Sequence, residues 1–115
     1  MDIGVTVAAG KPGVNIVRIS GRLDATTYEA AQPVIVEALE KSVDGMILNM
    51  ASLDFVSSAG LRTMIIVLKK AAADGKRVAM VDVQPQIYKI FKIAALDKVF
   101  RFFENEDGAI REIWP

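Results

Sequence analysis

Two adjacent serines, Ser57 and Ser58, stand where a hydroxyl group could do chemistry. They follow the apolar run that ends at Val56 and precede a segment with helical spacing, within the stretch DFVSSAGLR of Asp54–Arg62. One serine at such a position caps the helix by accepting a backbone N–H, which is worth about 1 kcal/mol. The second is left near the helix start, where unpaired N–H groups favour an anion. We therefore interpret the pair either as a cap alone or as a cap beside a phosphoacceptor.

Phosphorylation at this position would act on a partner more than on the fold. A phosphate adds about −1.5 to −2 charges at pH 7, which the start of a helix tolerates. A partner surface docked over the serine would instead meet a strongly hydrated group. The expected result is a chain that stays folded while its complex dissociates.

Residues needed by other common sites are missing from the sequence. None of the 115 residues is His or Cys, which excludes a Ser-His-Asp device, a thiolate nucleophile and the usual zinc sites. Neither a G-x-x-x-x-G-K-[ST] nor a G-x-G-x-x-G stretch occurs. We expect a protein that is not an enzyme and that has no cofactor or metal ion.

Three acidic residues offer one competing interpretation. Asp24, Asp54 and Asp82 could be the divalent-cation cluster of a phosphoacceptor receiver domain. The segment before the helix, however, ends in serines rather than in a phosphoaccepting carboxylate. We interpret the three acids as solvated loop residues and helix caps.

Charge and hydropathy narrow the expected partners. Lys plus Arg equals Asp plus Glu at 14 each, so no overall field attracts nucleic acid or an anionic membrane. The N-terminal segment Met1–Gly13 lacks the basic and apolar regions of a signal peptide, and no apolar run approaches the roughly 20 residues that span a bilayer. A protein or small-molecule partner in the cytoplasm is expected.

The elements that must position the serines follow from periodicity, in a chain whose length suits one domain over residues 1–115. A β-hairpin is expected first, and alternating strands and helices after it. The expected strands are Ile3–Val7, Val14–Ser20, Gly45–Met50, Lys76–Val83 and Lys98–Phe103. The expected helices lie in Ala25–Lys41, from Ser58 to just before Gly75, in Pro85–Leu96 and in Asn105–Pro115. This order predicts an α/β fold in which a mixed central sheet is covered by about four helices.

Two helices carry local expectations. In the first, Thr26 and Glu29 have the spacing of a capping box, and Pro33 predicts a kink or a late start. In the helix that begins at Ser58, the expected core stripe is Leu61, Met64, Ile65, Leu68 and Ala72, with Arg62, Thr63, Ile66, Lys69 and Lys70 turned outward. An exposed Ile66 is either a docking contact or an ordinary surface residue.

Four stretches, GRLDATT, ILNM, LDFVSSAGLRTMI and FKIAALDKVFRFF, resemble the STAS family. The similarity is to its small single-domain members, the bacterial anti-sigma-factor antagonists, and it implies a STAS-type fold over nearly the whole chain. In that family, an anti-sigma factor that is also a serine kinase of histidine-kinase-like ATPase fold phosphorylates one serine at the start of the second helix. The unphosphorylated antagonist binds this kinase, the phosphorylated form is released, and a PP2C-type phosphatase resets it. Carried over by the motif, the acceptor is Ser58, with Ser57 as the alternative.

The resemblance also implies a partner-binding surface around the acceptor. Asp24, in the Gly-x-Leu-Asp stretch, matches a family position beside the phosphorylation site. The full expected set is Asp24, Thr26, Ser57, Ala59, Gly60, Arg62 and Ile66. Well-known members read Asp-Ser-Ser-Gly or Asp-Ser-Thr-Gly at this motif, so an acid is replaced by Ser57 and a hydroxyl by Ala59. Loss of the acid removes like-charge repulsion against a phosphate.

Two other functions remain open. One is a STAS scaffold or lipid-transport subunit that binds its partner without phosphorylation. The other is a module that binds a nucleotide or another small molecule. A scaffold would bind its partner equally well after Ser58→Asp, whereas a nucleotide binder would show saturable binding with no protein partner present. The regulated pathway and the oligomeric state are not specified by the sequence.

Overall fold

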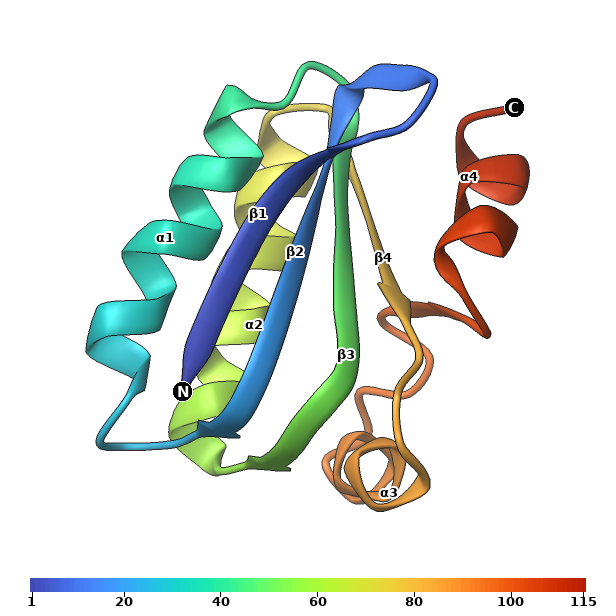
Figure 1. Ribbon diagram of the computed structural model, residues 1–115. Helices are drawn as coiled ribbons and strands as arrows, with labels where there is room; N and C mark the ends of the chain where they lie inside the picture. Colours follow the sequence, from blue (N-terminus) through green and yellow to red (C-terminus); the bar gives the residue numbers. More distant parts are fainter.

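The computed structural model describes all residues from Met1 to Pro115 as a five-stranded sheet with four helices (Figure 1). The strands are β1 (Asp2–Ala8), β2 (Lys11–Leu23), β3 (Gly45–Val56), β4 (Arg77–Val81) and β5 (Arg101–Phe103). The helices are α1 (Tyr28–Lys41), α2 (Ser58–Ala73), α3 (Pro85–Ile93) and α4 (Glu106–Ile113). The predicted α/β class, with its mixed sheet and N-terminal hairpin, is confirmed.

Strand order in the sheet follows the sequence, β1-β2-β3-β4-β5. β1 is antiparallel to β2, and the pairs from β2 to β5 are parallel. Right-handed crossovers between successive neighbours place their helices on one face, and α1 and α2 lie together there (Figure 1). α4 lies on the opposite face, beside β4, and α3 lies beyond the end of β4.

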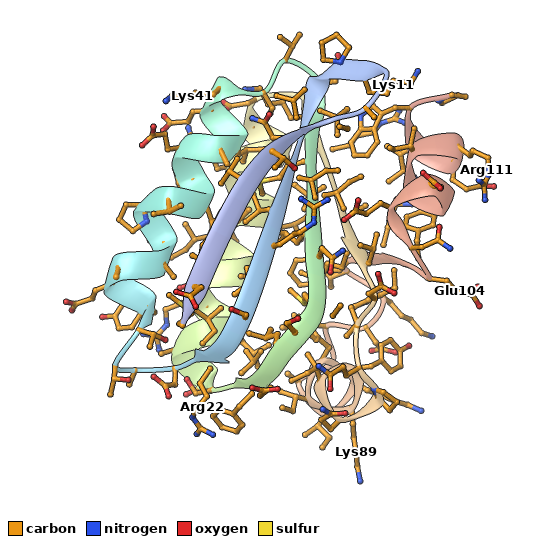
Figure 2. All side chains as sticks on the ribbon, viewed as in Figure 1. Lys11, Arg22, Lys41, Lys89, Glu104 and Arg111 are labelled. Carbon is orange, nitrogen blue, oxygen red and sulfur yellow. The ribbon has the colours of Figure 1, made fainter.

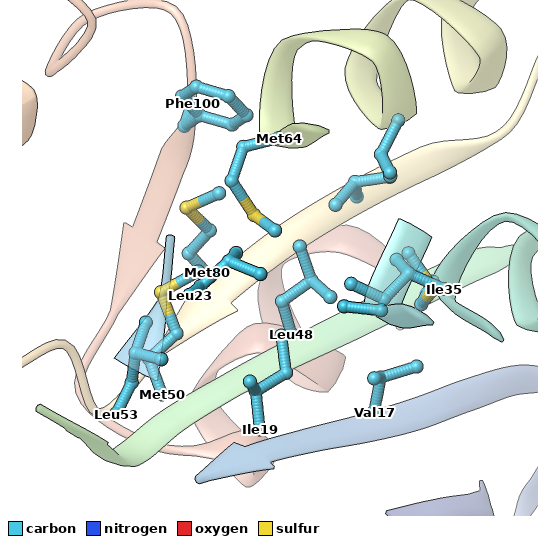
Figure 3. Close-up of a cluster of buried hydrophobic side chains, with 14 of the residues drawn as sticks. Val17, Ile19, Leu23, Ile35, Leu48, Met50, Leu53, Met64, Met80 and Phe100 are labelled. Atoms are coloured by element: carbon cyan, nitrogen blue, oxygen red, sulfur yellow. The ribbon is translucent and has the colours of Figure 1, made fainter. Parts of the chain in front are cut away.

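β3 is the centre of the core because both of its faces are covered. Met46, Leu48 and Met50 belong to the larger apolar cluster, which joins the sheet to α1, α2 and α3. Figure 3 shows Leu48 and Met50 within this cluster. Ile47, between them, belongs to the smaller cluster beneath α4. Period-two alternation between two buried faces explains why the stretch Gly45–Met50 shows no polar alternation.

β3 continues well beyond the predicted end at Met50. Its register with β2 shifts twice, so that β3 contributes more residues than β2 over the same length. After the shifts, Leu53 and Val56 are buried while Asp54 is exposed. The bulges hide the strand pattern from sequence inspection, because an inserted residue breaks the period-two alternation. The strand therefore delivers the chain directly to Ser57.

α1 differs from expectation at its start. The helix begins at Tyr28, its N-cap is Thr27, and no side chain caps it. The predicted capping box is wrong because the Thr26 hydroxyl and N–H both donate to Asp24 Oδ1 instead, at 2.6 and 2.9 Å. Pro33 lies inside the helix without delaying its start.

α2 is rotated about its axis relative to the predicted stripe. Its buried residues are Gly60, Thr63, Met64, Val67 and Ala71, whereas Ala72 is exposed. The prediction that Thr63 faces outward is wrong: its hydroxyl donates to Gln32 Oε1 of α1 at 3.1 Å, which satisfies the buried polar group. α2 packs against α1 as well as against the sheet, so its buried face is wider than one apolar stripe.

The two last elements are short. β5 covers only Arg101–Phe103, and α4 is capped by Asn105, whose side chain accepts the Gly108 N–H at 2.8 Å. Glu106 fastens α4 to the sheet by accepting hydrogen bonds from Arg18 at 3.0 Å and from Asn49 at 2.7 Å.

None of the four helices has the length and apolar character needed to cross a bilayer.

Candidate functional site

The start of α2 packs against Leu23, the last residue of β2. The Ser57 N–H donates to the Leu23 carbonyl oxygen at 3.0 Å. A Cβ added to Gly60 would lie 2.5 Å from that oxygen and 2.9 Å from Val56 Cγ1. Only glycine allows the first turn of α2 to approach the strand this closely. The contact brings Asp24, the next residue of the chain, to the start of α2.

The structure distinguishes the two serines by their hydrogen bonds at the start of α2. Ser57 is the N-cap, and its hydroxyl accepts the Gly60 N–H at 3.4 Å while its carbonyl accepts the Leu61 N–H at 2.9 Å. Ser58 is the first residue of α2. Its side chain is exposed. No hydrogen bond of the chain uses its hydroxyl, so capping leaves Ser58 available for another reaction.

Asp24 is held in place by its own loop. Its Oδ1 accepts the Thr26 N–H and hydroxyl, and its Oδ2 lies 3.4 Å from Arg22 Nε. The Thr26 hydrogen bonds, with a smaller contribution from Arg22, lower the pKa of the Asp24 carboxyl below its ordinary value. The carboxylate therefore stays ionised and keeps a fixed direction beside α2. Thr26 serves mainly to orient Asp24.

Arg22 and Phe55 lie at the same end of the sheet as Ser57, and neither was predicted from the sequence. They are paired across β2 and β3, and the Arg22 guanidinium carbon lies 4.3 Å from the centre of the Phe55 ring. Figure 2 shows Arg22 at the lower end of β2, close to the start of α2. Their pairing depends on the two register shifts, so no local sequence signal could have revealed it.

Three of the predicted residues share one exposed face of α2. Ser58, Arg62 and Ile66 are spaced by four residues, which places them on the same side of a helix. All three are exposed; we call them the Ser58 face. Arg62 forms no ion pair within the chain. The face thus combines a hydroxyl, an unpaired cation and an apolar residue.

The other predicted residues of α2 are less exposed to solvent. Ala59 is half-buried, and Gly60 is buried beneath the first turn. Gly60 positions the helix through packing, so any effect on a partner is indirect. Asp24 and Thr26 stand in the loop next to the Ser58 face. The predicted residues therefore lie together where β2 and β3 end and α2 begins, and within this set only Gly60 is buried.

The competing receiver-like interpretation finds no support in the geometry. No group of three or more acidic, His or Cys side chains is placed to hold a metal ion. Asp24 is engaged with Thr26 and Arg22, while Asp82 follows β4 and Asp54 lies within β3. The three carboxylates do not form a ligand set.

Fold and site together define a small α/β domain with a hairpin-led mixed sheet and a free serine at the start of its second helix. Comparison with known families identifies it further. The STAS domain profile matches residues 6–109, and the chain belongs to this family. The resemblance seen in the sequence is confirmed.

Named relatives come from several bacteria. An anti-sigma F factor antagonist from Paenibacillus polymyxa is 29% identical over 102 residues, covering 88% of this chain and 87% of the relative. The structure of an anti-sigma-factor antagonist (STAS) domain protein from Planctomyces limnophilus superposes with a TM-score of 0.87 at 18% identity, covering 100% of both chains. The structure of the Bacillus cell fate determinant SpoIIAA in its phosphorylated form gives a TM-score of 0.71 at 20% identity, covering 97% of this chain and 99% of that one.

Proposed function

We propose that this protein is an anti-sigma-factor antagonist that works by partner switching, with Ser58 as the phosphoacceptor. The unphosphorylated chain binds an anti-sigma factor that is also a serine kinase of histidine-kinase-like ATPase fold. Phosphorylation of Ser58 releases the chain, and a PP2C-type phosphatase restores it. The protein acts in the cytoplasm as a binding module and catalyses no reaction itself.

The observation that carries this proposal is the difference between the two serines. Ser57 caps α2, whereas the hydroxyl of Ser58 is exposed and unbonded. A phosphate on Ser58 therefore breaks no hydrogen bond of the fold. The relative from Paenibacillus polymyxa, an anti-sigma F factor antagonist, and the phosphorylated SpoIIAA structure support the assignment of function.

The Ser58 face also explains why a phosphate would act as a switch. In the unphosphorylated chain, a partner can pack on Ile66 and pair with Arg62 or Asp24. A doubly charged phosphate at the centre of that contact would have to be stripped of water, and it would draw Arg62, one helical turn away, out of any pairing with the partner. Burying a double charge that one cation does not neutralise costs several kcal/mol. Each 1.4 kcal/mol is a tenfold change in affinity. The complex would weaken by orders of magnitude while the fold is unchanged.

The test mixes the protein with candidate histidine-kinase-like serine kinases encoded in the same genome, with and without ATP. Phosphate is mapped by mass spectrometry, and kinase binding is measured by isothermal titration calorimetry before and after phosphorylation. We expect phosphate on Ser58, loss of binding upon phosphorylation, and no phosphate in Ser58→Ala.

Ser57→Ala is the matched control, because it removes the neighbouring hydroxyl and leaves the proposed acceptor. It should still be phosphorylated on Ser58. Phosphate found only on Ser57 would move the acceptor by one residue. Tight kinase binding that persists unchanged in Ser58→Asp, with no phosphate detected, would contradict the switch and leave a constitutive scaffold.

A further inference from the structure

A depression at the ends of β4 and β5 has no role in the proposed switch. It has a volume of about 470 Å³ and is lined by Asp82, Val83, Tyr88, Phe102, Phe103 and Glu104; we call it the Asp82 depression. It lies outside the carboxyl ends of the parallel strands β4 and β5. Its volume falls within the usual range for ligand sites.

Aromatic rings form one wall of the Asp82 depression. Tyr88 and Phe102 meet edge to face, with centroids 5.1 Å apart and planes at 83°. Phe102 is supported from behind by Phe91, whose centroid lies 5.7 Å away. Phe91 is fully buried, whereas Tyr88 is exposed. Such ring faces attract cations through their quadrupole.

Two carboxylates also line the Asp82 depression. Asp82 directly follows β4, and Glu104 directly follows β5. Both are exposed, and neither takes part in an ion pair of the chain. Figure 2 shows Glu104 projecting outward near the start of α4. Two unpaired anions beside aromatic rings favour a planar cation that can both stack on a ring and donate paired hydrogen bonds to carboxylates, as a guanidinium does.

The loop that carries Asp82 is fixed before any ligand arrives. Its N–H donates to the Phe103 carbonyl at 3.3 Å, and its backbone has φ of 54°. Two residues on, the Gln84 side-chain amide donates to the carbonyls of Ala51 and Leu53, at 2.7 and 3.0 Å. These carbonyls belong to the irregular part of β3. The loop is thereby tied to the central strand, and the depression is preorganised.

Neighbouring cations define how a ligand can enter. Lys89 and Lys92 line a different depression, on the other side of Tyr88. Arg101 already lies over the Phe103 ring, 5.3 Å from its centre. No Lys or Arg of the chain lines the Asp82 depression itself, so a ligand cation there meets the two carboxylates without competition from a lining cation.

We propose that the Asp82 depression receives an arginine side chain of a protein partner. The carboxylates of Asp82 and Glu104 would repel the α-carboxylate of free arginine, whereas a peptide-bound arginine carries no such charge. Lysine fits less well, because its ammonium neither stacks on rings nor pairs with two carboxylates in a plane. The site is an anchor for an interface, and it does not depend on phosphorylation of Ser58.

The experiment titrates the 15N-labelled full-length chain with N-acetyl-arginine methylamide and follows amide chemical shifts. N-acetyl-norleucine methylamide serves as the uncharged probe and N-acetyl-lysine methylamide as the non-planar one. We expect saturable shifts centred on Asp82, Val83, Tyr88 and Glu104 for the arginine probe, with weaker binding of lysine and none of norleucine.

The variant pair Asp82→Asn with Glu104→Gln removes both charges. Asn, like Asp, is among the non-glycine residues that tolerate the left-handed backbone of position 82, so the loop should keep its shape. We expect binding to weaken by about tenfold or more. The pair Asp107→Asn with Glu112→Gln makes the same change of charge on α4 and should bind like the parent chain.

Three outcomes would overturn the proposal. They are arginine shifts scattered over the surface, equal binding of the norleucine probe, and absence of saturable shifts at millimolar probe. Because no kinase is present, these outcomes leave the Ser58 switch untouched, and failure of that switch leaves the arginine titration valid.

Discussion

The backbone N–H of Ser57 donates to the carbonyl oxygen of Leu23 across 3.0 Å, and this bond ties the residue before α2 to the end of β2. The same carbonyl faces Gly60. One oxygen atom thus locates both the cap and the first turn of the helix that carries Ser58.

Gly60→Ala should destabilise the protein by about 1–3 kcal/mol, because its methyl group would overlap Leu23 and Val56. Urea unfolding followed by circular dichroism measures the loss. Gly4→Ala is the matched control, since nothing lies within 4 Å of its added Cβ, and it should not destabilise. Equal stability of the two variants would show that α2 shifts without cost.

Ser57→Ala and Ser58→Ala should differ in thermal stability. Removing the cap at Ser57 should cost about 0.5–1 kcal/mol, at the lower end of measured caps because its hydrogen bond is long, 3.4 Å. Removing the exposed hydroxyl of Ser58 should cost almost nothing. Differential scanning calorimetry compares the two. A larger loss for Ser58→Ala would mean that the cap has been assigned to the wrong serine.

Asp24 should titrate below 3.8, its ordinary value, because the Thr26 hydrogen bonds and Arg22 favour the carboxylate. A lowered folded-state pKa stabilises the fold above the unfolded pKa, and this contribution is lost as the pH falls through the folded value. Thr26→Ala should raise the midpoint toward 3.8, as measured by 13C NMR of the side-chain carboxyl. A midpoint that does not move in Thr26→Ala would contradict this account of the loop.

A phosphoserine incorporated at position 58 during translation should sense Arg62, one helical turn away. The guanidinium favours the doubly charged phosphate, so its second pKa should fall below the usual value of about 6. In 31P NMR titrations, Arg62→Gln should raise this pKa, whereas Lys69→Gln, further along α2, should leave it unchanged. An identical pKa in all three proteins would mean that Arg62 points away and remains available to a partner.

Much of the fold followed from local pattern. The stretch Gly45–Met50, which lacks polar alternation, predicted a strand buried on both faces, and Gly75 and Pro85 marked a helix end and a helix start. The serine pair predicted a cap, although spacing alone could not assign it to Ser57. These features depend on residues close in sequence, whose propensity and periodicity determine the local secondary structure.

Features that depend on long-range register could not be predicted. The extension of β3, the stacking of Arg22 on Phe55 and the burial of Thr63 each require knowing which strand or helix lies opposite. The Asp82 depression likewise combines residues from two strand ends and α3. Tyr88 and Phe102, which line it, come from α3 and β5, and their contact follows only from the packing of these two elements.

The length of β3 also sets a distance. Val81, at the end of β4, is paired with Asn49, and β3 runs on from there to Val56. At about 3.3 Å per residue, this stretch places the end of β4, from which Asp82 follows, roughly 20 Å from the start of α2 along the strand. β3 thus fixes the distance between the two places. A partner that binds both the Asp82 depression and the Ser58 face must present its two contacting groups at a matching spacing. Shorter or differently spaced molecules gain only one of the two contacts and none of the avidity of both.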